Sequence, residues 1–188
     1  MVGTKTLVAM GAVLIVAATA LVYAISLAGD QPPRDGDMIG FDMSGGGPAP
    51  SIPFHGANGA PVSLDDFAGQ VVLVNFWATW CAPCVHEMPS LDRLQQDLGG
   101  DDFQVVAISV DQGGEDQVRR FFQSQGLSDL EVYTDPSGRV AAAFGTPGLP
   151  TTVVIGRDGS WLGTLVGPAD WSGPDARALL RHFLDRPV

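Results

Sequence analysis

Two cysteines, Cys81 and Cys84, are the residues of this 188-residue chain best suited to covalent chemistry, and they are its only cysteines. They stand in the sequence Trp80-Cys81-Ala82-Pro83-Cys84. A thiolate can attack a disulfide or bind a soft metal, so the pair can react with each other, with a substrate or with a metal ion. Because there is no third cysteine, neither can belong to a separate structural disulfide.

Structural zinc is one alternative for this spacing, because Cys-x-x-Cys often forms half of a four-ligand zinc site. The remaining ligands would have to come from His55, His86 and His182. Only His86 is close to the cysteines in sequence, and a helix would point it away from them. The sequence therefore favours redox chemistry over zinc.

The surrounding pattern indicates where the cysteines lie. Residues 71–78 form a nearly unbroken apolar run of strand length. After the cysteines, apolar residues recur at helical spacing: Val85, Met88, Leu91, Leu94 and Leu98. The pair thus sits where a buried strand ends and a helix begins. Helix starts stabilise anions, so we expect a lowered pKa and a nucleophilic role for Cys81, with Cys84 as the more shielded resolving thiol.

The sequence resembles the thioredoxin superfamily in having a strand, then Trp-Cys-x-Pro-Cys, then a helix with a proline, Pro89, five residues after the second cysteine. Within it, residues 74–89 look most like the membrane-anchored TlpA, ResA and CcmG (DsbE) group, and closest to TlpA. Residues 167–171, Gly-Pro-Ala-Asp-Trp, are similar to a stretch in TlpA too. The resemblance covers about residues 51–188 and implies a thiol:disulfide oxidoreductase whose redox-active disulfide is Cys81 to Cys84.

The resemblance also implies which residues meet the substrate. Pro150, before the apolar run 151–155, matches the family's cis-proline, which faces the cysteine pair. A trans proline opening a strand is the alternative. With Pro150, the expected substrate-binding residues are Trp80, Pro83 and Leu149. Trp77 and Phe76 we assign to packing.

Glu87 is the expected third catalytic residue. Cytosolic thioredoxin has a buried aspartate six residues before its first cysteine, where this chain has Asn75. Glu87, three residues after Cys84, is the candidate replacement that accepts the Cys84 proton. An ordinary exposed helix glutamate is the alternative. With Glu87 disfavouring early thiolate formation, we expect a reductant, with a potential nearer about −270 mV than about −120 mV.

Two other functions remain as alternatives. A copper-binding chaperone module for cytochrome oxidase assembly could use both thiolates with Met88 or a distal histidine, but Sco-type copper chaperones have a longer cysteine spacing. A thiol peroxidase would need a threonine three residues before its cysteine, whereas Thr79 stands two before Cys81. We expect His86 to face solvent, and we expect no metal and no cofactor.

The pattern predicts an α/β fold, and the resemblance implies that residues 51–188 form a thioredoxin-like domain with a central mixed β-sheet flanked by helices. Expected elements are a second buried strand at 103–110, parallel to the first, a helix near 115–125, a hairpin of 151–155 with 161–166, and a last helix near 174–184.

The N-terminus predicts the location of this domain. Residues 6–29 contain no charged residue, and this run is longer than the about 20 residues that a helix needs to cross a bilayer. Residues 1–29 are therefore expected to be a transmembrane signal-anchor. A cleaved signal peptide is the alternative. Residues 30–50, rich in Pro and Gly, are expected to be a flexible linker.

The expected location is the bacterial inner membrane, single-pass, with the soluble domain in the periplasm. The net charge of −11 argues against nucleic acid as a partner. The resemblance implies protein clients with disulfides, either apocytochrome c or copper-site assembly proteins, and a transmembrane thiol electron donor of the DsbD or CcdA type.

Overall fold

The computed structural model describes residues 19 and 31–186. The chain divides into two compact units, Met1–Pro32 and Pro33–Val188, and the fold below is that of the second. Apart from Thr19 and the last residues before Pro33, the predicted anchor and its junction lie outside the described residues. No helix within residues 19 and 31–186 combines the length and the apolar character that a membrane span needs.

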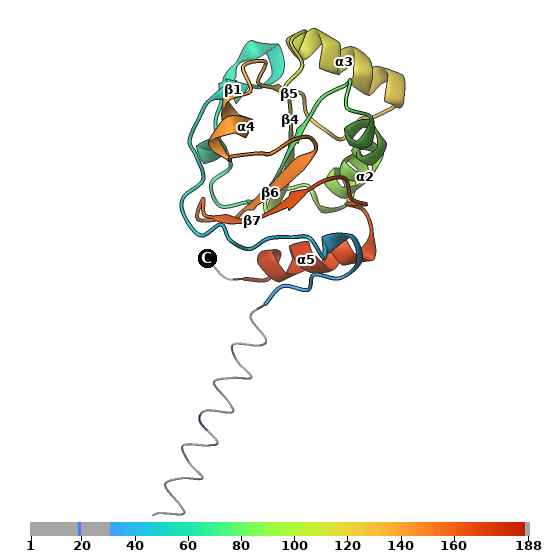
Figure 1. Ribbon diagram of the computed structural model, residues 1–188. Helices are drawn as coiled ribbons and strands as arrows, with labels where there is room; N and C mark the ends of the chain where they lie inside the picture. Colours follow the sequence, from blue (N-terminus) through green and yellow to red (C-terminus); the bar gives the residue numbers. More distant parts are fainter. Residues whose placement is uncertain (1–18, 20–30, 187–188) are drawn as a thin grey trace, which may run out of the picture. The chain divides into compact units, whose positions relative to one another are not determined.

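The folded unit contains strands, α-helices and 3₁₀ turns, whose order along the chain can be followed by the colours of Figure 1. The strands are β1 (Phe54–His55), β2 (Pro61–Val62), β3 (Val71–Trp77), β4 (Phe103–Ser109), β5 (Tyr133–Thr134), β6 (Thr151–Ile155) and β7 (Trp161–Val166). The α-helices are α2 (Ala82–Leu98), α3 (Gly114–Gln125), α4 (Arg139–Ala143) and α5 (Pro174–Leu184). Three 3₁₀ turns are η1 (Gly36–Met38), η2 (Ala57–Gly59) and η3 (Leu64–Phe67).

The strands form one mixed sheet in the order β2-β1-β5-β4-β3-β6-β7. At its centre β3 pairs in parallel with β4, and α2 is the crossover between them. On its other side β3 pairs antiparallel with β6, which continues into the β7 hairpin. The α/β mixed-sheet prediction is therefore confirmed, including the parallel pair and the hairpin.

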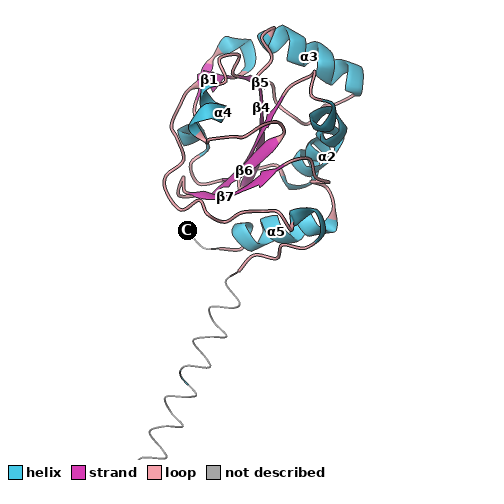
Figure 2. Ribbon diagram, viewed as in Figure 1, coloured by secondary structure: helices cyan, strands magenta, loops and turns pink. Residues whose placement is uncertain are grey.

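Both faces of the sheet are buried, which explains why β3 is apolar throughout. Its residues alternate between two cores, with Leu73 on one face and Val74 on the other. The first core is completed by apolar residues of α2, α3 and α5, and the second by α4 and η3. Accordingly, α4 lies on the opposite side of the strands from α2 in Figure 2.

The predicted long elements lie where the sequence placed them. The α5 bounds are those expected, and α3 and β4 differ by one residue from the predicted ranges. Four short elements, β1, β2, β5 and α4, were not predicted, because two to five residues are too few to show a period.

The prediction that residues 30–50 form a flexible linker is corrected for residues 36–48, which are packed on the folded unit. Residues 36–38 lie against α5 and residues 42–48 run along β7, with Met38 and Phe41 buried. Asp42 exchanges backbone hydrogen bonds with Thr164, and Pro48 forms a bridge with Ser160. Burial of the two large side chains outweighs the Pro- and Gly-rich composition. We call residues 36–48 the N-terminal strap.

Candidate functional site

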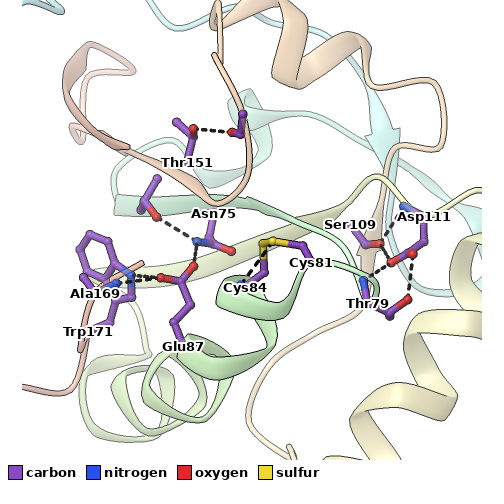
Figure 3. The surroundings of a disulfide bond; sticks show 12 residues. Asn75, Thr79, Cys81, Cys84, Glu87, Ser109, Asp111, Thr151, Ala169 and Trp171 are labelled. Atoms are coloured by element: carbon purple, nitrogen blue, oxygen red, sulfur yellow. Dashed lines mark hydrogen bonds between the residues drawn. A yellow bond between two sulfur atoms is a disulfide. The ribbon is translucent and has the colours of Figure 1, made fainter. Parts of the chain in front are cut away.

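The cysteine pair lies at the junction of β3 and α2, as predicted. Cys81 caps the N-terminus of α2, and its Sγ accepts a hydrogen bond from the Cys84 backbone N–H at 3.3 Å. The two residues are joined by a disulfide (Figure 3). In this position a Cys81 thiolate would be stabilised by the Cys84 backbone N–H and by the helix dipole.

The two sulfur-bearing residues differ in access to solvent. Cys81 is 6% exposed, whereas Cys84 is completely buried among core residues. Only Cys81 can be approached from outside without displacing core side chains. This is the asymmetry expected of an attacking and a resolving cysteine.

The predicted substrate-binding residues lie around the pair but differ in exposure. Trp80, just before Cys81, is 70% exposed, and Pro83 is exposed on the first turn of α2. Leu149 is half-buried, Pro150 is buried, and the bond between them is cis. Because Phe76 pairs with Thr151, Pro150 lies at the same sheet edge as the loop before Cys81. Trp77 and Phe76 are fully buried, as expected of packing residues.

Glu87 is buried, so the exposed-glutamate alternative is wrong. It is 2% exposed and lies one turn after Cys84 on α2 (Figure 3). Its Oε1 accepts a hydrogen bond from Asn75 Nδ2 at 2.8 Å. Its Oε2 accepts hydrogen bonds from the Ala169 backbone N–H at 3.0 Å and from Trp171 Nε1 at 3.3 Å.

These surroundings decide the protonation of Glu87. Burial raises its pKa from 4.5 to about 7, because removing a carboxylate from water disfavours its charged form. The three hydrogen bonds from Asn75, Ala169 and Trp171 act in the opposite direction and keep the ionised form accessible. A carboxyl group with a pKa close to neutral can both accept and release a proton at physiological pH.

Asn75, which stands six residues before Cys81, positions Glu87 through its side-chain amide. Its Nδ2 also donates to Thr152 Oγ1 at 2.9 Å, so both amide hydrogens are used. Its buried Oδ1 has no hydrogen-bond partner. In Figure 3 the Asn75 side chain lies between Glu87 and the disulfide.

The segment 167–171 is the part of the site that sequence reasoning did not assign. Ala169 and Trp171 supply two of the three donors to Glu87, although more than 80 residues separate them from it in sequence. Trp171 is fully buried, and its backbone N–H donates to Ser90 Oγ at 3.1 Å. The similarity of this segment to TlpA was the only signal that marked it.

A second polar cluster, around Asp111, supports the loop before Cys81 and was also missed. Asp111 is 1% exposed and accepts hydrogen bonds from the Thr79 backbone N–H at 2.8 Å and from Thr79 Oγ1 at 2.9 Å. Ser109 Oγ and Gln117 Nε2 donate to the same carboxylate. Thr79 lies two residues after the end of β3, and Asp111 lies two residues after the end of β4. Because β3 and β4 pair in parallel, their ends lie side by side, so the sequence contained a signal for this contact.

A cavity of about 450 Å³ lies beside Glu87, on the side of α2 that carries His86, Ser90 and Arg93. His86 is exposed, as predicted, and lies at this cavity. Residues of the strap and of segment 167–171 complete the lining. Within the described part of the chain, no three His, Cys, Asp or Glu residues are grouped to hold a metal ion.

Known proteins are similar to this chain in sequence. The Redoxin family matches residues 45–180. The thiol-disulfide oxidoreductase ResA of Bacillus subtilis is 32% identical over 127 residues, which cover 66% of this chain and 69% of ResA. The thioredoxin-like protein YneN of the same organism is 35% identical over 113 residues, covering 59% of this chain and 65% of YneN.

Solved structures agree with this result. A thiol:disulfide interchange protein of the thioredoxin family from Chlorobium tepidum has a TM-score of 0.59 and 27% identity, covering 74% of this chain and 97% of that chain. A secreted thiol-disulfide isomerase from Corynebacterium glutamicum has a TM-score of 0.61 and 26% identity, covering 73% and 86%. Together with the disulfide at the start of α2, these matches show a thiol-disulfide oxidoreductase. The chain belongs to the Redoxin family and, within the thioredoxin superfamily, to the group that includes ResA and CcmG.

Proposed function

We propose that this protein is a membrane-anchored reductant of protein disulfides in cytochrome biogenesis, with a TlpA-like role. The observation that carries the direction of the reaction is Glu87, a buried carboxyl group one turn from Cys84 whose pKa is about 7. A negative charge at this place disfavours the Cys84 thiolate, which makes the dithiol a better electron donor.

The reaction has two steps. The Cys81 thiolate attacks one sulfur of the client disulfide, so a mixed disulfide forms and one client thiolate leaves and takes up a proton. Glu87 then accepts the Cys84 proton, and the Cys84 sulfur attacks Cys81 Sγ. The second client thiolate leaves, so the client is reduced by two electrons and Cys81 and Cys84 are oxidised to the disulfide.

Client contact is proposed for the residues around the cysteines. Exposed Trp80 and Pro83 and the Leu149–Pro150 segment lie at the sheet edge that carries Cys81. An extended client segment could pair with the backbone beside Pro150 and direct its disulfide toward Cys81. Apocytochrome c and copper-site assembly proteins are the two client classes we propose.

Location and electron supply complete the proposal. Residues 1–29 serve as a single-pass anchor in the bacterial inner membrane, and the folded unit from Pro33 onward works in the periplasm. A transmembrane thiol donor of the DsbD or CcdA type supplies two electrons after each cycle and converts the Cys81–Cys84 disulfide back to the dithiol.

Covalent trapping tests this function. A Cys84→Ser chain cannot complete the second step, so we expect clients to accumulate as mixed disulfides on Cys81 in the membrane fraction. Mass spectrometry identifies them, and a Cys81→Ser chain is the matched control. Recovery of cytochrome-assembly proteins on the Cys84→Ser chain alone supports the proposal. Equal recovery on both chains contradicts it.

A further inference from the structure

The N-terminal strap is fixed to the domain close to the segment that surrounds Glu87. Phe41 is 1% exposed, and its ring centroid lies 6.2 Å from that of Phe183 in α5. The strap passes so close to Gly163 in β7 that a Cβ there would lie 2.4 Å from the Phe41 ring and 2.7 Å from the Asp42 carbonyl oxygen. Docking of the strap therefore requires glycine at position 163.

Asp37, in the same strap, reaches the segment that holds Glu87. Its Oδ2 accepts a hydrogen bond from the Asp170 backbone N–H at 2.9 Å. Asp170 lies between Ala169 and Trp171, the two residues of this segment that donate to Glu87. Asp37, Glu87 and Asp170 also line the same 450 Å³ cavity.

We propose that Asp37 is a positioning residue for Glu87, because it holds segment 167–171 in the conformation that directs the Ala169 and Trp171 N–H groups at the Glu87 carboxylate. This inference rests on the proposed function of Glu87 as proton acceptor. It gives the strap, which the sequence marked only as a linker, an indirect role in the chemistry of the site, through segment 167–171.

The expected effect has a definite sign. Trp171 is fully buried and its backbone N–H is bonded to Ser90, so we expect Glu87 to remain covered in an Asp37 variant. The two donors from this segment should then weaken without exposing Glu87 to water. Weaker donors stabilise the ionised carboxylate less, which raises the pKa of Glu87. The charged and titratable groups that line the cavity with Glu87 and Asp37 are His86, Arg93 and Asp170. Cys81 and Cys84 are joined in the disulfide.

Two substitutions of Asp37 separate its hydrogen bond from its charge. Asp37→Ala and Asp37→Asn both remove the negative charge, but only asparagine keeps an oxygen that can accept the Asp170 N–H. The chain has three glutamates, Glu87, Glu115 and Glu131, so selective ¹³C labelling gives three carboxyl signals to follow against pH in the full-length chain in detergent micelles.

We expect the Glu87 pKa in Asp37→Ala to exceed that in Asp37→Asn by roughly half a pH unit, the size of one modest hydrogen-bond effect. The signals of Glu115 and Glu131 should titrate alike in both variants. Equal Glu87 pKa values in the two variants, or a lower value in Asp37→Ala, overturn the inference.

A second pair of variants tests the strap without changing Asp37. Gly163→Ala should displace the strap and raise the Glu87 pKa as Asp37→Ala does, whereas Gly47→Ala, which meets nothing within 4 Å, should not. An unchanged pKa in Gly163→Ala also overturns the inference. Failure of the proposed function is a different result: Glu87→Gln would then reduce clients at the wild-type rate, whatever the Asp37 variants show.

Discussion

The Asn75 side-chain amide donates a hydrogen bond to Glu87 Oε1 over 2.8 Å in the fully buried space beside the cysteine helix. This contact places a carboxyl group, rather than a cation or an apolar side chain, next to the resolving cysteine. Since the amide cannot itself titrate, Asn75 orients Glu87 and leaves the proton chemistry to it.

Replacing Glu87 with glutamine should slow the second reaction step. Glutamine has the same shape but accepts no proton, so we expect the attack of Cys84 to slow by about 10²-fold, while the first attack by Cys81 changes little. Rapid-quench analysis should show the mixed disulfide accumulating. Glu131→Gln, at an exposed position, is the control and should react like the wild type. A mixed disulfide that decays equally fast in both variants contradicts the role of Glu87.

The raised pKa of Glu87 also predicts how stability depends on pH. Between pH 4.5 and about 7 the folded chain keeps a proton that the unfolded chain has released, so stability should fall as pH rises through this range. The stabilisation attributable to the raised pKa of Glu87 is roughly 3 kcal/mol. It is fully present below pH 4.5 and is lost as the pH rises to about 7. Urea denaturation of the oxidised chain and of Glu87→Gln measures it. A constant difference between the two across this range would show that the pKa is not raised.

The long elements and the position of the cysteines could be predicted because each depends on local pattern. The apolar run of β3 and the spacing of Met88, Leu91 and Leu94 in α2 are visible within one window of sequence. The contacts around Glu87 could not be predicted, because Trp171 reaches it only after the chain has crossed the sheet several times. The same reason hid the strap, where burial of Met38 and Phe41 depends on α5 far along the chain.

The cluster around Asp111 should stabilise the fold as well as the loop before Cys81. Asp111→Ala leaves the half-buried donors of Thr79 and the buried hydroxyl of Ser109 without an acceptor, and we expect a loss of roughly 3 kcal/mol in the free energy of unfolding. Asp111→Asn, which keeps one oxygen, should lose less. Urea denaturation of both variants tests this order. Equal stability of Asp111→Ala and the wild type contradicts the account of the loop.

Trp80 should matter for clients and not for folding. Because it is 70% exposed, Trp80→Ala is expected to change the free energy of unfolding by less than about 0.5 kcal/mol. In the Cys84→Ser background it should lower the yield of trapped clients. Ile39→Ala is the matched control, since Ile39 is 80% exposed but belongs to the strap. A trap yield that falls equally for both substitutions would remove Trp80 from the client-binding surface.

The reduction potential of the Cys81–Cys84 couple tests the proposed direction of electron flow most directly. Equilibration of the full-length chain with glutathione buffers, followed by alkylation and mass spectrometry, gives the oxidised fraction at each potential. We predict a value more negative than about −200 mV and closer to that of thioredoxin, about −270 mV, than to that of DsbA, about −120 mV. A value above roughly −180 mV would make the pair an oxidant and contradict the proposal that this protein reduces its clients.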